Sequence, residues 1–287
     1  MSGVWHQVSD IRTPCEITSR SRHLTPDTRH LRSYGRIKAR TLKPRQEKLL
    51  ATLLPHLTVP AEGEIDVAAL FLEPPPPRGA GAGGGGHSDA PVFADLSASA
   101  RPPSQPSPAR GEGFTVLEIG FGGGEHLAAQ AMAHPEKRFI GVEPFLNGVA
   151  SCLRHIEEAN AQNIRLHQGD ARDVITRLPD ASLDLVYILF PDPWPKTRHH
   201  KRRLIQPEFL DELARVLKLG AELRFATDWA NYAVWTLEHI ARDRRFTWLA
   251  ACADDWRKPW PGHVTTRYEA KRLGDCAPVW LRFVRVD

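Results

Sequence analysis

The sequence lacks the cysteine pattern of a disulfide-stabilised or zinc-binding protein. Its four cysteines, Cys15, Cys152, Cys252 and Cys276, lie far apart and form no CxxC pair, so we interpret them as reduced thiols. No run approaches the roughly 18 apolar residues of a membrane-spanning helix. No apolar core follows the basic residues near the start, so we expect no signal peptide. These absences predict a cytoplasmic protein without a metal site.

The sequence also lacks a strong excess of charge of one sign. Basic residues number 38 and acidic residues 34, which gives a net charge of +4. This excess is too small to identify a nucleic-acid partner. Whether the chain binds a nucleic acid must be judged from the local distribution of its cations. The chain has 287 residues, of which 41% are hydrophobic and 25% charged. Such a composition is typical of a globular protein with a buried core, in one large domain or two small ones.

Glycine and proline are concentrated in one region and divide the chain. From Glu73 to Gly113 they supply 17 of 41 residues, and such a stretch cannot bury enough apolar surface to offset its ordering entropy. We predict a low-complexity, disordered insertion over 61–113 and a flexible arm over 1–28. Residues 29–60 combine a basic segment around Tyr34 with a leucine-rich helix. We interpret this part as an RNA-binding segment with a docking helix, or else as a solvated basic tail.

Residues 114–287 alternate between strand-like and helix-like patterns. Strands are predicted at 114–119, 138–143, 164–168, 183–190, 222–227 and 278–285, with a further strand near 246–250. Helices are predicted at 44–57, 124–133, 146–161, 206–217 and 230–242. Strands separated by helix-length segments indicate βαβ units. We therefore predict an α/β fold with a doubly wound, mostly parallel sheet.

A glycine-rich loop follows the first predicted strand, with Gly120, Gly122 and Gly124 in G-x-G-x-G spacing. Glycines at this point let the backbone turn sharply and approach a ligand closely. Glu125 stands where the dinucleotide-binding pattern has its third glycine. We predict that the three glycines line a cofactor that contains a nucleoside.

Three acidic residues accompany this loop at the ends of the first three predicted strands: Glu118, Glu143 and Asp170. Glu143 comes 23 residues after Gly120, near the spacing at which an acid accepts hydrogen bonds from ribose hydroxyls. Asp170 could hold an adenine amine. Three carboxylates would repel a pyrophosphate, so they favour S-adenosylmethionine over NAD, the alternative cofactor. Taken singly, Glu143 or Asp170 could instead be a helix N-cap.

A proline-rich loop, Phe190-Pro-Asp192-Pro-Trp194-Pro-Lys196, ends the fourth predicted strand. Proline fixes φ and removes a backbone donor, so the loop is stiff. It holds a carboxylate, an indole and an ammonium group just past a strand's carboxyl end, where ligands bind in open α/β sheets. A basic run over 198–203 follows at once and is either a phosphate-binding surface or a solvated one.

Several motifs then occur together in one order. They are Glu118-Ile-Gly-Phe-Gly-Gly-Gly, Gly141-Val-Glu143, Gly169-Asp170-Ala171, Phe190-Pro-Asp192-Pro-Trp194, Lys196-x-Arg198-His-x-Lys201-Arg202-Arg203, Ala226-Thr227-Asp228 and Thr266-Arg-Tyr-Glu269. This combination resembles the bacterial tRNA (guanine-N7)-methyltransferase family, known as TrmB. The resemblance covers Phe114 to the end of the chain and the basic segment around Tyr34. It implies a Rossmann-like class I S-adenosylmethionine-dependent methyltransferase domain over 114–287, which forms 7-methylguanosine at the variable-loop guanine 46 of tRNA.

The resemblance also implies roles for individual residues. Asp192 would be catalytic and would contact the cofactor together with Glu118, Gly120, Gly122, Gly124, Glu143 and Asp170. The substrate contacts would be Lys196, Asp228, Thr266, Arg267, Tyr268 and Glu269. The tRNA contacts would be Arg198, His199, His200, Lys201, Arg202 and Arg203. No metal is implied, and the oligomeric state, monomer or homodimer, stays open.

The chemistry of the residues agrees with these roles but leaves alternatives. Guanine N7 has an in-plane lone pair and no proton, so the protein must mainly position the base and stabilise the cation that forms. Trp194 could stack on a flipped base or serve a hydrophobic structural role. Asp228 could cap a helix, and 266–269 could be a plain loop. Methylation of an exocyclic amine and RNA binding without catalysis are the alternative functions.

Overall fold

The computed structural model describes residues 41–72 and 113–287. The predicted arm over 1–28, the basic segment around Tyr34 and most of the predicted insertion lie outside the described residues. Among the helices of the described ranges, none has both the length and the apolar character needed to cross a membrane.

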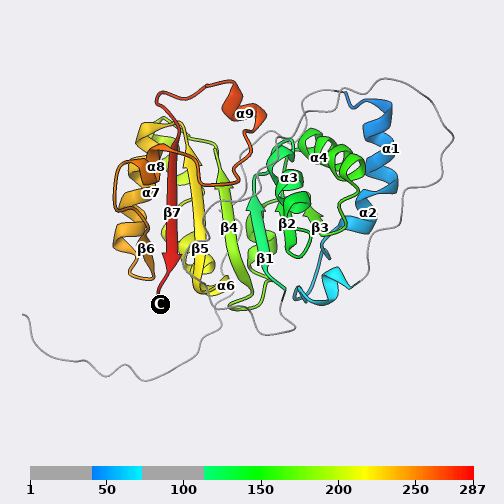
Figure 1. Ribbon diagram of the computed structural model, residues 1–287, viewed down its shortest axis with the longest axis horizontal. Helices are drawn as coiled ribbons and strands as arrows, with labels where there is room; N and C mark the ends of the chain where they lie inside the picture. The colour runs from blue at the N-terminus through cyan, green and yellow to red at the C-terminus, as the bar shows by residue number, and fades with distance from the viewer. Residues whose placement is uncertain (1–40, 73–112) are drawn as a thin grey trace, which may run out of the picture. The chain divides into compact units, whose positions relative to one another are not determined.

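Seven strands form one sheet in the order β3-β2-β1-β4-β5-β7-β6 (Figure 1). The strands are β1 Thr115–Ile119, β2 Arg138–Val142, β3 Ile164–His167, β4 Leu183–Leu189, β5 Leu217–Thr227, β6 Phe246–Trp248 and β7 Val279–Arg285. Strands β1 to β5 pair in parallel, while β7 pairs antiparallel with both β5 and β6. The predicted doubly wound, mostly parallel sheet is confirmed.

Helices cover both faces of this sheet. They are α1 Pro44–Thr52, α2 Leu54–Leu57, α3 Glu125–Ala133, α4 Leu146–Ala159, α5 Ala171–Ile175, α6 Pro207–Val216, α7 Ala230–Arg242, α8 Asp254–Arg257 and α9 Arg267–Ala270, with 3₁₀ turns η2 Ala69–Phe71 and η3 Thr197–Arg202. Strand β1 is buried throughout, and its successive side chains enter different core clusters. Val116 packs in the cluster that includes α3 and α4, whereas Leu117 packs in the cluster that includes α5, α6 and α7. Such burial on both faces explains the continuous apolar runs of the parallel strands.

The strand order reverses at β1, and this reversal places the site. After β1 the chain moves outward through β2 and β3, and then returns to the other side of β1 as β4 and β5. In such sheets ligands bind in the crevice outside the carboxyl ends of the strands, at this point of reversal. The short helix α9 lies over that edge of the sheet, above the middle strands (Figure 1).

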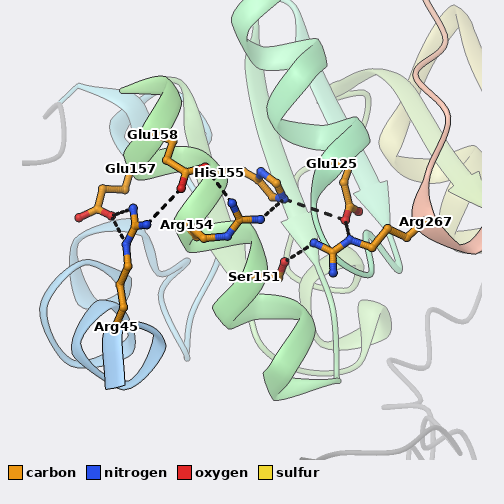
Figure 2. Close-up of polar contacts among 8 residues, drawn as sticks. All are labelled: Arg45, Glu125, Ser151, Arg154, His155, Glu157, Glu158 and Arg267. Carbon is orange, nitrogen blue, oxygen red and sulfur yellow. Dashed lines mark hydrogen bonds and ion pairs between the residues drawn. The ribbon is translucent and has the colours of Figure 1, made fainter. Parts of the chain in front are cut away.

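The helices before the sheet domain pack on α4 and on the edge strand β3. Leu49 of α1 and Leu57 of α2 are buried in the same core cluster as α4. Arg45 of α1 pairs with Glu157 of α4 at 2.7 Å and with Glu158 at 3.2 Å (Figure 2). The backbone then runs beside β3, where Thr58 and Leu166 form a parallel bridge. The leucine-rich helices are thus in contact with the body that contains the sheet.

Two elements differ from the sequence prediction by more than two residues. The predicted helix over 44–57 is interrupted at Leu53, because Pro55 lacks an N–H and its ring clashes with the carbonyl one turn earlier. Strand β5 begins at Leu217 and not at 222, since an irregularity in its pairing with β4 carries the strand through Gly220, whose φ is +79°. A left-handed glycine is the usual way to fit an extra residue into a strand.

Candidate functional site

The glycine loop after β1 opens onto free space. Gly120 and Gly122 have φ of +73° and +55°, and a Cβ on either would meet no atom within 4 Å. Their conformations need glycine, and the space beside them leaves room for a ligand against the backbone. Gly124 differs, because a Cβ there would lie 2.4 Å from Sγ of Cys152 on α4. Its observed role is to let α3 and α4 approach closely, and contact with a cofactor stays a prediction for this residue.

Glu143, at the end of β2, holds the glycine loop from the side. Its carboxylate accepts hydrogen bonds from Gly122 N at 2.8 Å and from Phe145 N at 2.8 Å. Burial raises the pKa of Glu143 to about 6, although both hydrogen bonds oppose the shift, and the charge of Asp192 adds to it. Glu143 and Asp192 are therefore close enough to interact across the site, although they follow different strands.

The other two predicted cofactor acids already have partners within the protein. Glu118, on β1, is 2% exposed, and its Oε2 lies 2.7 Å from Nδ1 of His126 on α3. Asp170 accepts a hydrogen bond from Arg172 N at 3.0 Å and caps α5, with the Arg172 guanidinium 3.2 Å away. The alternative role of Asp170 as a helix N-cap is thus present, and both cofactor contacts stay predictions.

The proline-rich loop after β4 has an unusual backbone. Phe190 and Trp194 have φ of +50° and +44°, in the left-handed region that is costly for bulky residues and is found mainly at functional sites. The loop begins where Phe190 N donates to Ala226 O of β5 at 2.7 Å. Asp192 is exposed at its tip, yet the surrounding protein removes enough water to raise the pKa of its carboxyl. Within the described parts of the chain, no hydrogen bond or ion pair engages that carboxylate.

Arg203 does not lie on the surface with the other predicted RNA contacts. It is 1% exposed, its Nε donates to Pro193 O at 2.9 Å and its Nη2 donates to Asn231 Oδ1 at 2.7 Å. Its guanidinium also stacks on the rings of Tyr232 and Trp235. These contacts correct the sequence interpretation, because a cation enclosed in this way fastens the proline-rich loop to α7 instead of facing RNA.

The remaining residues of the basic run form turn η3. Lys196, which precedes the turn, Arg198 and Lys201 are exposed, while His199, His200 and Arg202 are half-buried. Arg202 lies over the Trp194 ring with its Cζ 5.0 Å from the centroid. The indole is therefore already covered by a cation within the protein, and the sequence alone could not distinguish this packing from base stacking.

Asp228, just past β5, has a free carboxylate oxygen. The residue is 3% exposed; Oδ2 accepts from Gly274 N at 2.9 Å, and Oδ1 is buried with no hydrogen-bond partner in the described residues. Asp228 does not cap α7, since the N–H of Ala230 donates to Asp275 Oδ1 at 2.8 Å. An unpaired buried acceptor is costly, and its retention indicates an external donor.

The 266–269 segment forms the start of α9 through a capping box. Thr266 Oγ1 accepts from Glu269 N at 3.2 Å, and Glu269 Oε2 is 3.4 Å from Thr266 N. Tyr268 packs against Phe190 with ring centroids 5.7 Å apart. Burial raises the pKa of Tyr268, and the nearby Asp228 and Asp192 carboxylates contribute to the shift. The structure thus brings Asp192, Asp228 and Tyr268 together from three separate segments.

The site also contains residues that the sequence patterns did not identify. His126 and His263 are buried neighbours with ring centroids 5.5 Å apart, and Glu125 pairs at 2.5 Å with Arg267, a predicted substrate contact. No periodicity or motif relates these positions, because they are 137 and 142 residues apart and meet only in the folded chain. In the described ranges, no group of three or more His, Cys, Asp or Glu side chains is arranged to hold a metal ion.

Comparison with known proteins identifies a family model and several similar chains. The family model Methyltransf_4, described as "Putative methyltransferase", matches residues 112–280. A tRNA (guanine-N(7)-)-methyltransferase of Caulobacter vibrioides is 51% identical over 91% of this chain and 99% of its own length. The corresponding protein of Hyphomonas neptunium is 45% identical over 88% and 99%. The crystal structure of an rRNA methylase from Streptococcus thermophilus aligns with a TM-score of 0.42 at 13% identity over 61% of this chain and 89% of that one. From the sequence similarity along nearly its whole length, the chain belongs to the tRNA (guanine-N7)-methyltransferase family.

Proposed function

We propose that this protein transfers a methyl group from S-adenosylmethionine to N7 of a guanine in tRNA, and that the target is the variable-loop guanine 46. Family membership supports the class of reaction, since the relatives above are named for it. The observation that carries the proposal is a pair of acidic side chains at the ends of the adjacent strands β4 and β5: the Asp192 carboxylate and Oδ1 of Asp228 accept no hydrogen bond from the described residues.

This pair of carboxylates suits guanine better than the other bases. Ionised carboxylates only accept hydrogen bonds, and guanine presents two adjacent donor groups, N1–H and the N2 amine. Adenine places an acceptor at its N1, which a carboxylate would repel. Tyr268 lies within the electrostatic range of both carboxylates and gives the base a ring surface to pack on. The guanine edge opposite N7 is thereby held, and N7 is left free.

The residues present also suit S-adenosylmethionine. Open space beside two left-handed glycines allows a ligand to lie on the backbone. The Glu143 carboxylate, which bonds to Gly122 N of that loop, can accept from ribose hydroxyls. When bound, this cofactor supplies an electrophilic methyl group on a sulfonium. Acids around the loop agree with a cationic ligand and disfavour a pyrophosphate.

The protein's contribution to the reaction is positioning and charge compensation. Guanine N7 attacks with its own lone pair, so no general base is needed, and the product ring carries a positive charge. Asp192 and Asp228 provide the compensating negative charge at fixed positions, which costs no reorganisation during the reaction. Exposed Lys196, Arg198 and Lys201 lie next to this centre along the chain and can contact tRNA phosphates.

Nucleoside analysis of labelled tRNA tests the proposal. Unmodified tRNA is incubated with the protein and methyl-labelled S-adenosylmethionine, then digested, and label is expected in 7-methylguanosine. A transcript with adenosine at position 46 should accept no label. Label in N6-methyladenosine alone would replace the proposed acceptor by an exocyclic amine. Binding of tRNA without binding of the cofactor would leave only an RNA-binding protein.

A further inference from the structure

The first turn of α3 connects the two halves of the site. Helix α3 begins directly after the glycine loop, and its first two residues, Glu125 and His126, both reach toward the 263–269 region. Glu125 Oε1 lies 2.5 Å from Arg267 Nε, and Arg267 Nη2 donates to Ser151 Oγ of α4 at 3.3 Å (Figure 2). The Glu125 carboxylate also packs against Gly123, since a Cβ on that glycine would lie 2.5 Å from it. One carboxylate therefore contacts both the glycine loop and α9.

A second connection runs through two buried imidazoles. His126 bonds to Glu118 of β1 at 2.7 Å, and His263 bonds to Glu269 of α9 at 2.8 Å. The two imidazole rings are neighbours, with centroids 5.5 Å apart. His126 is 1% exposed, and each ring keeps one buried nitrogen without a partner in the described residues. Closely packed groups therefore form a continuous series from Glu118 to the capping box of 266–269.

One turn further along, α3 makes a third contact with the same region. Gln130 Nε2 donates to Gly262 O at 2.6 Å. Residues 126 and 130 share one face of the helix, so this face carries both side chains toward the 262–263 turn. The helix that begins at the glycine loop therefore supplies several of the polar contacts that dock the region before α9, beside the aromatic contacts of Trp260 and His263 with the sheet.

Helix α9 cannot keep its position by itself. It has four residues, and an isolated helix of one turn is unstable in water because nucleation fixes several dihedral angles for one hydrogen bond. Its placement must come from tertiary contacts, and the ones described above tie it to the glycine loop. Any ligand that orders this loop lowers the entropy cost of ordering α9, and the reverse must hold equally.

We propose that Glu125 and His126 are positioning residues that couple the cofactor site to the guanine-binding segment, so that an occupied cofactor site raises the affinity for tRNA. This inference rests on the proposed function and extends it to the order and regulation of binding. Glu125 acts through Arg267, and His126 acts through His263 and Glu269. Neither side chain needs to touch the reacting atoms.

The test measures the affinity for unmodified tRNA with and without saturating S-adenosylhomocysteine, so no turnover is involved. For the wild type, the tRNA Kd is expected to fall at least about fivefold when S-adenosylhomocysteine is present, within the usual range of coupling energies. We call the tRNA Kd without S-adenosylhomocysteine divided by the tRNA Kd with it the ratio. In Glu125→Gln the ratio should drop below about twofold, while the Kd for S-adenosylhomocysteine alone stays within about twofold of the wild type. A role limited to general stability would not change the ratio selectively.

Three further variants make the result specific. His263→Gln breaks the second connection from the other side and should also lower the ratio. Combining Glu125→Gln with Arg267→Gln should lower it no further than Glu125→Gln alone, because both remove one ion pair. Glu136→Gln is the matched control beyond the far end of α3, where Glu136 pairs with His134 at 3.4 Å, and it should leave the ratio unchanged.

The outcomes separate this inference from the proposed function. A wild type that binds tRNA equally with and without S-adenosylhomocysteine overturns the coupling but leaves methyl transfer untouched. Variants that keep the full ratio, or that lose S-adenosylhomocysteine binding itself, also overturn it. A wild type that binds no tRNA overturns both proposals at once.

Discussion

The acidic residues at the carboxyl ends of the parallel strands have different surroundings in the two halves of the sheet. On the side of β1, β2 and β3, the carboxylates of Glu118, Glu143 and Asp170 are each hydrogen-bonded to nearby protein groups. On the side of β4 and β5, Asp192 has no hydrogen-bond partner among the described residues, and Asp228 keeps one buried oxygen unpaired. One half is therefore preorganised by internal contacts, and the other half keeps acceptors available for an incoming donor.

This difference indicates that the two halves of the site serve different ligands. Internal hydrogen bonds hold a carboxylate in one orientation, which suits a cofactor that binds the same way in every cycle. Free acceptors make the site dependent on the donors that a substrate brings, and a base with the wrong donors leaves them unpaired at a cost. Specificity for guanine should therefore depend on Asp192 and Asp228, and cofactor affinity on the other half.

The largest expected effect comes from changing Asp192, whose carboxylate has no partner among the described residues. Asp192→Asn keeps the shape of the side chain but replaces one acceptor by a donor and removes the charge that compensates the methylated ring. We expect kcat to fall by roughly a hundredfold to a thousandfold, with the Kd for S-adenosylhomocysteine changed little. Single-turnover methyl transfer and calorimetry measure the two effects. A tenfold weaker binding of S-adenosylhomocysteine with an unchanged rate of methyl transfer would instead assign Asp192 to the cofactor half of the site.

The second effect concerns the support of the proline-rich loop. Arg203→Lys removes the hydrogen bond to Asn231 and the packing of the guanidinium on two aromatic rings. We therefore expect the free energy of unfolding to fall by about 2 kcal/mol. Arg198→Lys, at an exposed position five residues earlier, is the matched control and should leave stability unchanged. Chemical denaturation measures both. Equal stabilities for the two variants would contradict the structural role of Arg203 and favour the tRNA contact that the sequence predicted.

Much of the fold follows from sequence patterns that are local. Strand β1 is a short apolar run that leads into glycines, and α4 has apolar residues at helical spacing, so both were predicted close to their observed bounds. The short helices α5 and α9 were not predicted, because four or five residues show no period. Caps such as Asp170 and Thr266 are local signals, but the formation of such short helices also depends on tertiary contacts, which no local pattern contains.

The candidate site was predictable only in part, for a related reason. Asp192 and Glu143 stand at strand ends, and the topology of a parallel sheet brings strand ends to one edge whatever the side chains are. Arg203 belongs to a basic run that looks uniform in sequence, and only the folded chain shows that one of its cations is enclosed by Tyr232 and Asn231. His126 and His263 meet across more than a hundred residues, so their pairing had no local signal.

A third prediction uses the pKa of Glu143. Its value near 6 lies above the usual 4.5, so the carboxylate that we propose accepts from a ribose becomes protonated as pH falls through about 6. The Kd for S-adenosylhomocysteine should rise up to about tenfold per pH unit below that point, and Glu143→Gln should flatten this dependence. Because the folded pKa is raised, Glu143 contributes stability below pH 4.5 that is lost as pH rises through 6. Isothermal titration across pH 5 to 8 checks the first effect, and a flat wild-type profile would contradict it.

The smallest effect is expected on the exposed cations next to the free carboxylates. Replacing Arg198 and Lys201 together by Gln removes about two phosphate contacts, so the slope of log K against log salt should become less steep by between about 1.4 and 1.8. Neither stability nor S-adenosylhomocysteine affinity should change, because both side chains are exposed and distant in sequence from the glycine loop. Filter binding of tRNA at several salt concentrations measures the slope. If the slope is unaltered, the tRNA backbone is held elsewhere, and the free carboxylates must select guanine without phosphate contacts from the turn beside them.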